Sequence, residues 1–137
     1  MTAALITSSM LQKAQSAPKV FNRSVLAELE AMSKLDARQV VNSVAELLGW
    51  RVLETFEMFK LAPAFDLLPL SKAMQRNCLL MRDPKEGLIG ILSDPFDMDL
   101  SMWLEIQAKG PLSYRLALAS DIAAFVTKTE ESARALD

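Results

Sequence analysis

The sequence predicts an α+β fold in which N-terminal helices pack on a small β-β-α-β-α domain with a three-stranded mixed sheet. Apolar residues recur at helical spacing between residues 25 and 48, whereas three short apolar runs follow between residues 78 and 118. Hydrophobic residues make up 51% of the 137-residue chain, and charged residues make up 23%. This composition is sufficient to bury the core of a small domain, so wholesale disorder is excluded.

Composition and pattern divide the chain into three parts. Residues 1–20 are mostly small and polar and end near an Ala-Pro pair, which indicates a flexible N-terminal arm. Residues 21–68 form a helical part followed by an irregular segment. Residues 69–137 form the β-β-α-β-α part, which ends in a helix.

Two helices are expected in the helical part. The first covers residues 23–33, with an apolar side formed by Val25, Leu26, Leu29 and Met32. The second begins after Asp36, which forms a capping box with Gln39, and ends at Gly49, which can adopt the left-handed conformation. The irregular segment that follows is rich in phenylalanine. Its aromatic residues fit core packing or a groove for a partner, and both interpretations stay open at this point.

The last part contains the signals for the sheet. Pro69 suits the first turn of a short helix through Arg76. Residues 78–82 and 88–93 form two strands around the turn Asp83–Gly87, which predicts a β-hairpin. A helix then leads to a third strand at residues 112–118 and to a last helix that Ser120 or Asp121 is expected to cap. A right-handed strand-helix-strand crossover places the second and third strands parallel.

Three aspartates, Asp94, Asp97 and Asp99, lie between the second strand and the following helix. Carboxylates there can accept hydrogen bonds from the first N–H groups of the helix and meet the positive end of its dipole. A calcium loop needs more oxygen ligands, a central glycine and a closing glutamate. We therefore expect helix capping rather than a metal site, with contact to a partner as a further alternative.

Reactive side chains are scarce. The chain has no histidine, which excludes Ser-His-Asp and Cys-His catalysis and most zinc sites. The single cysteine, Cys78, lies in an apolar run and is expected in the core. No glycine-rich phosphate loop is present, and the mixed charge, −2 overall, indicates no nucleic-acid binding. We predict no catalytic residue, no cofactor and no metal.

The N-terminus lacks the pattern of a signal peptide, and no apolar run reaches the roughly 20 residues that span a bilayer. One unpaired cysteine suits a reducing compartment. The sequence therefore predicts a cytoplasmic protein.

The order of these elements resembles a known family. A capped helix ending in "LLG", an "LLP" element, a hairpin and the turn "SDPFD" at Ser93–Asp97 follow one another as in the N-terminal domain of type II secretion and type IV pilus assembly ATPases, of the general secretory pathway protein E type. The resemblance covers residues 24–131. The ATPase core of that family lies C-terminal to this domain, so we expect a fragment or a stand-alone relative that is not an enzyme by itself.

The resemblance implies a docking and regulatory module. Its expected partners are the cytoplasmic domain of an inner-membrane platform protein and its own ATPase domain, which would place it at the inner-membrane face. The candidate partner-binding residues are Leu26, Leu29, Met32, Phe56, Met58 and Phe59. For each of them, burial in the core is the competing interpretation.

Some relatives bind cyclic di-GMP through a motif that begins Arg-Leu-Gly and contains a later glycine. Alignment places the first three positions on Ser24, Val25 and Leu26 and the later glycine on Ser33. The motif's arginine and glycines are thus replaced, which weakens this alternative. If the chain senses the dinucleotide, Arg23 and Arg38 are the candidate nucleotide-binding residues.

Overall fold

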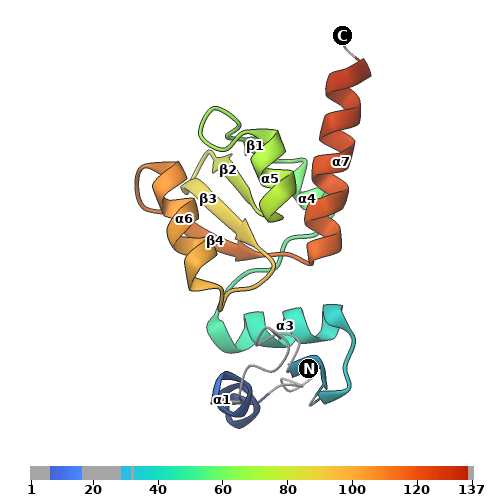
Figure 1. Ribbon diagram of the computed structural model, residues 1–137, viewed down its shortest axis with the longest axis vertical. Coiled ribbons are helices and arrows are strands. Elements are labelled where there is room, and N and C mark those ends of the chain that lie inside the picture. The colour runs from blue at the N-terminus through green and yellow to red at the C-terminus, as the bar shows by residue number, and fades with distance from the viewer. Residues whose placement is uncertain (1–6, 17–28, 32, 136–137) are drawn as a thin grey trace. The chain divides into compact units, whose positions relative to one another are not determined.

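The computed structural model describes residues 7–16, 29–31 and 33–135 (Figure 1). The chain forms two compact units, Met1–Val52 and Leu53–Asp137. In the first unit, helix α1 spans Ser8–Ser16, within the segment expected to be a flexible arm. Most of the helix predicted at residues 23–33 lies outside the described residues, and the packing of the N-terminal helices on the sheet domain stays a prediction.

Helix α3, Ala37–Leu48, has the ends that its sequence predicts. The Gln39 N–H donates to Asp36 Oδ1 at 2.8 Å, and Gln39 Oε1 accepts from the Asp36 N–H at 3.1 Å. Gly49 ends the helix at φ +74°, a left-handed conformation that costs least for glycine. The capping box and the C-cap are therefore confirmed.

The second unit is built on a four-stranded sheet with the strand order β1-β2-β3-β4. Strands β2, Leu79–Asp83, and β3, Gly87–Leu92, form the predicted antiparallel hairpin, and β4, Ser113–Leu116, lies parallel to β3. The α+β class is confirmed, but the predicted number of three strands is wrong. The additional strand is β1, Ala62–Pro63, which pairs antiparallel with β2 at the edge of the sheet. Two residues that include a proline give no strand pattern, because the pairing depends on β2 rather than on local preference.

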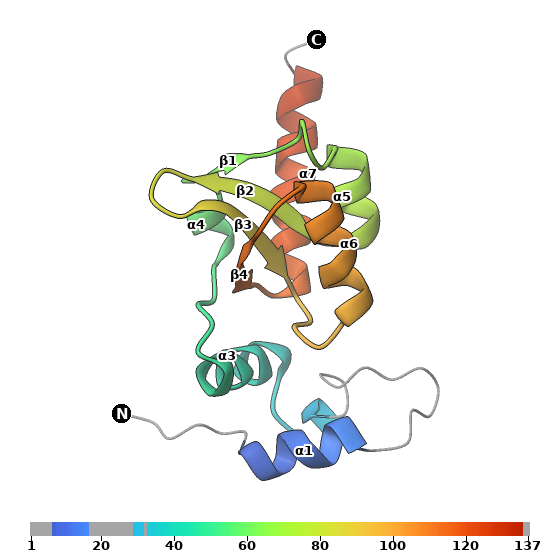
Figure 2. The same cartoon turned by 90° about the vertical axis from the view of Figure 1, so that its left-hand side faces the viewer.

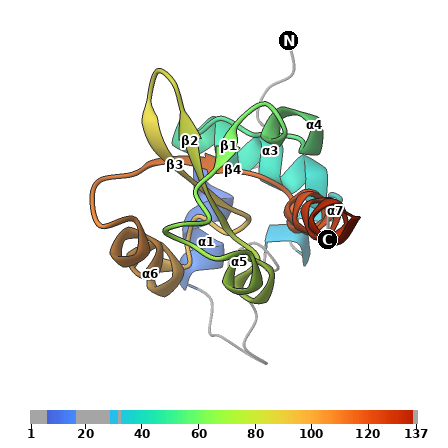
Figure 3. The same cartoon turned by 90° about the horizontal axis from the view of Figure 1, so that it is seen from above.

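Helices surround this sheet. Helices α5, Leu70–Arg76, and α6, Met98–Ala108, lie together on one side of the strands (Figures 2 and 3). The short helix α4, Thr55–Met58, lies away from α6 and beside the long helix α7, Ala119–Ala135 (Figure 1). Helix α7 packs against both α4 and α5.

One continuous core joins these elements. Its buried apolar residues come from both strands of the hairpin, from α6 and from the first half of α7, and they include Cys78, as expected. The irregular segment adds four of them: Leu53, Met58, Ala64 and Leu68. The sequence pattern groups this segment with the N-terminal helices, but its buried apolar residues pack with those of the sheet.

Candidate functional site

Two phenylalanines are exposed at α4. Phe56 is 58% exposed and Phe59 is 50% exposed, while Met58 between them is fully buried. The Lys60 ammonium lies 5.5 Å from the centre of the Phe56 ring, within reach of a cation–π contact. We call Phe56, Phe59 and Lys60 the α4 surface. Large exposed aromatic side chains are typical of protein-binding sites.

The α4 surface is held in place by contacts with α7. The Phe59 and Phe125 rings lie 4.7 Å apart between centroids, and Phe125 is buried in the core. The Thr55 hydroxyl donates to Asp121 Oδ1 at 2.8 Å. A helix of four residues is not stable alone, so these contacts fix its conformation.

The structure exposes none of the other predicted partner-binding residues that it describes. Leu29 and Met58 are fully buried, so neither side chain is available at the surface in this conformation. Leu26 and Met32 lie outside the described residues. Sequence spacing could not separate Met58 from its exposed neighbours, because a single helical turn has no repeat to read.

One of the two candidate nucleotide-binding residues belongs to the part of the chain that the structure describes. Arg38 is exposed in the first turn of α3. Arg23 lies outside the described residues. At Ser33, where the cyclic di-GMP motif has a glycine, the hydroxyl donates to the Leu29 carbonyl at 2.6 Å.

The aspartates between β3 and α6 act on the backbone. Asp94 Oδ1 accepts from the Phe96 N–H at 2.9 Å, and Asp97 Oδ1 accepts from the Leu100 N–H at 3.0 Å, which makes Asp97 the N-cap of α6. Asp99 lies exposed in the first turn. The predicted capping is confirmed for Asp97. Among the residues that the structure describes, no group of three or more acidic, cysteine or histidine side chains could hold a metal ion.

A second exposed surface was not predicted. Met98, Met102 and Ile106 on α6 are 64%, 57% and 70% exposed. We call these three residues the α6 surface. They follow one another at intervals of four, so they lie along one side of the helix. The sequence spacing contains this signal, but Leu100 and Leu104 form a second apolar side of the same helix, and that side is the one expected in the core.

A side-chain hydrogen bond between β4 and α6 holds this helix against the sheet. The Tyr114 hydroxyl donates to Glu105 Oε1 at 2.9 Å. Gly90 makes room for this tyrosine, because a Cβ at position 90 would lie 3.2 Å from its ring. Burial, with a smaller contribution from Glu105, raises the pKa of Tyr114 to about 12.

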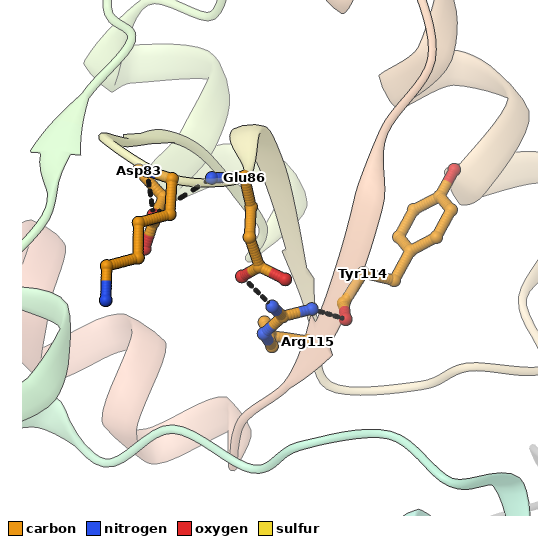
Figure 4. A network of polar contacts seen from close by, with 5 residues as sticks. Asp83, Glu86, Tyr114 and Arg115 are labelled. Carbon is orange, nitrogen blue, oxygen red and sulfur yellow. Dashed lines mark hydrogen bonds and ion pairs between the residues drawn. The ribbon is translucent and has the colours of Figure 1, made fainter.

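Arg115 closes part of the outer edge of the sheet (Figure 4). Its guanidinium donates to the Tyr114 carbonyl at 2.8 Å and pairs with Glu86. In the adjoining turn, Asp83 Oδ1 accepts from the N–H groups of Lys85 and Glu86, which lowers the pKa of Asp83. These charges are engaged in holding the hairpin and β4.

Comparison with known proteins places this fold in a family. Residues 56–136, more than half of the chain, match the family model described as MshEN domain. The chain belongs to the MshEN domain family. The residues that match the family model include the α4 and α6 surfaces but not Arg38.

Solved structures share the fold of this MshEN domain. A structure described as MshE with cdg has a TM-score of 0.64 at 21% identity, over 90% of each chain. The N-terminal domain of XpsE has a TM-score of 0.64 at 18% identity, over 89% of this chain and 84% of that chain. A second crystal form of XpsE has a TM-score of 0.60 at 19% identity. The predicted resemblance to N-terminal domains of secretion and pilus-assembly ATPases is confirmed. No curated protein sequence matches the chain.

None of the helices in the described ranges combines the length and the apolar character needed to cross a bilayer.

Proposed function

We propose that this MshEN domain is a non-catalytic docking and regulatory module of a secretion or pilus-assembly ATPase. In this proposal it lies at the cytoplasmic face of the inner membrane and binds the cytoplasmic domain of a platform protein. The observation that carries the proposal is the α4 surface, where two phenylalanines are exposed on a helix fixed against α7.

The α4 surface suits docking for energetic reasons. Covering a phenylalanine removes a large apolar area from water, and few rotamers are lost because the side chain has two rotatable bonds. The Phe59–Phe125 and Thr55–Asp121 contacts already order the backbone, so binding does not have to fold it. Lys60 adds a positive charge that favours an acidic residue on the partner.

The remaining candidate residues have different parts in this proposal. Met58 supports α4 from within the core, and Leu29 is likewise fully buried. Leu26 and Met32 remain proposed contact residues. The chemistry of the chain also favours binding over catalysis: burial raises the pKa of the Cys78 thiol to about 11, which disfavours the reactive thiolate.

A charge placed on the α4 surface tests the proposal. We expect Phe56→Glu to weaken binding of the platform protein's cytoplasmic domain by at least about tenfold, measured by isothermal titration calorimetry with the full chain. Phe56 is more than half exposed, so circular dichroism should show an unchanged fold. Ile106→Glu on α6 is the matched control and should bind normally. Native affinity of the Phe56→Glu variant, or no binding by the unmodified chain, would overturn the proposal.

Binding of cyclic di-GMP is a second candidate. It is favoured by the likeness to the structure described as MshE with cdg, and by the exposed position of Arg38. Titration of the chain with cyclic di-GMP should then give heat that is reduced in Arg38→Ala. Absence of heat with the unmodified chain would remove this candidate and leave the docking proposal intact.

A further inference from the structure

We infer that the α6 surface is a second docking site, and that it takes an amphipathic helix with lysine or arginine beside its apolar residues. This inference goes beyond the proposed function, because it concerns another helix and another kind of partner. It follows from an apolar stripe, from the charges on both sides of the stripe, and from the state of the sheet edges.

The three residues of the α6 surface form a continuous apolar stripe and are not isolated exposed residues. Met98, Met102 and Ile106 extend over more than two turns of α6, and each is more than half exposed. The side that faces the core repeats the same spacing with Leu100, Leu104 and Ala108. Helix α6 is thus apolar on two opposite sides, which is typical of a helix covered on both. Methionines also allow a surface to adapt to a partner helix.

Carboxylates flank the stripe. At about 100° per residue, Asp99 projects on one side of Met102, and Glu105 projects on the other side. Both are exposed, as is Asp97 at the start of the helix. Of the charged residues between positions 97 and 109, three are acidic and one, Lys109, is basic. Another cation near this helix is Arg76, whose guanidinium lies 4.6 Å from the centre of the Trp103 ring. The stripe therefore complements a partner whose apolar residues lie between basic ones.

The same charges disfavour two other occupants. An anionic membrane surface would be repelled by Asp99 and Glu105 on either side of the apolar residues. A second copy of the chain would bring its own two carboxylates to the edges of the stripe, where those of the first already lie. Like charges at an interface oppose association.

Recognition by strand addition is disfavoured at both edges of the sheet. At one edge, β1 has two residues, and Pro63 has no N–H to donate. At the other edge, the Leu53 N–H donates to the Leu116 carbonyl, and Arg115 donates to the Tyr114 carbonyl. Contact with the side chains of a partner helix is therefore the mode that fits the α6 surface.

A designed peptide tests this inference with the full chain. The probe is a synthetic amphipathic helix of about 18 residues, with leucines on one side flanked by lysines, and its counterpart has glutamate at each lysine. Binding is followed by amide NMR shifts and by tryptophan fluorescence, to which Trp103 on the same helix contributes. We expect the lysine peptide to shift the amides of residues 98–106 and to bind at least about tenfold more tightly than the glutamate peptide.

Variants locate the contact. Ile106→Glu should weaken binding of the lysine peptide by about tenfold, and Asp99→Asn by a smaller factor that disappears at high salt. Phe56→Glu on α4 is the matched control and should bind the peptide normally, so failure here is distinct from failure of the platform proposal.

Three results would overturn the inference. The first is equal binding of the lysine and glutamate peptides, which would reduce the site to unspecific apolar contact. The second is concentration-dependent dimerisation, measured by analytical ultracentrifugation, that Ile106→Glu abolishes. The third is binding of the chain to phosphatidylserine vesicles in place of the peptide.

Discussion

Helices α3 and α6 have the same kinds of capping residue at their ends, but they differ in how many of their sides are apolar. Each has an aspartate at its N-cap, Asp36 or Asp97, whose side chain accepts from a backbone N–H three residues on. Each ends at a residue with positive φ, Gly49 at +74° and Lys109 at +60°. The local rules of capping therefore apply equally to both helices.

The two helices differ in which of their sides are apolar. Helix α3 buries Val40, Val41, Ser43, Val44 and Ala45 on one side. Its exposed residues are mostly polar: Ala37, Arg38, Gln39, Asn42, Glu46 and Leu48. Helix α6 buries one apolar stripe and exposes another. Capping thus sets where a helix begins and ends, whereas the number of apolar sides indicates how many surfaces cover it.

The largest expected effect separates the two sides of α6. Leu104 is fully buried, so Leu104→Ala should lower the free energy of unfolding by about 2–5 kcal/mol, through lost apolar burial and the cavity that remains. Ile106 is 70% exposed, so Ile106→Ala should change it by less than about 0.5 kcal/mol. Urea unfolding of both variants measures the difference. Similar losses for the two variants would show that Ile106 is covered within this chain.

Substitutions at the C-caps of α3 and α6 should change the stability of the protein in opposite directions. Gly49→Ala forces a side chain into a left-handed conformation and should destabilise the protein by about 1 kcal/mol. Lys109→Gly relieves the same cost at the end of α6 and should stabilise it by up to about 1 kcal/mol. Thermal unfolding followed by circular dichroism measures both. A destabilising Lys109→Gly would mean that the lysine side chain contributes more than its backbone costs.

The smallest expected effect concerns the attachment of α6 to the sheet. The pKa of Tyr114 is about 12 in the folded protein, compared with 10.0 for an ordinary tyrosine. Because the folded state holds the proton more tightly, this contribution to stability is complete below about pH 10 and is lost as the pH rises through about 12. Partial exposure of Tyr114 makes the loss smaller than the full shift implies.

Tyr114 is the only tyrosine, so tyrosinate absorbance reports it directly. Glu105→Gln should lower its pKa only in part, since burial is the larger cause. Titration of Tyr114 in the native protein near pH 10 would contradict the partly buried position of its hydroxyl.

The residues that could be predicted share a local cause. Asp36, Gln39 and Gly49 define α3, and the turn Asp83–Gly87 defines the hairpin, because each acts on backbone groups a few positions away. The parallel position of β4 followed from the crossover rule. Strand β1 could not be found in this way, since its two residues are strand only through pairing with β2.

The candidate surfaces depend on contacts distant in the sequence. Phe56 and Met58 are two residues apart in a single turn, and only packing against α7 and the sheet decides that one is exposed and the other buried. The sequence by itself determined both caps of α3, the N-cap of α6, the hairpin turn, the strand order after Leu79 and the resemblance to the family. The tertiary structure decided β1 and which apolar side chains reach the surface, because burial depends on surfaces that residues distant along the chain supply.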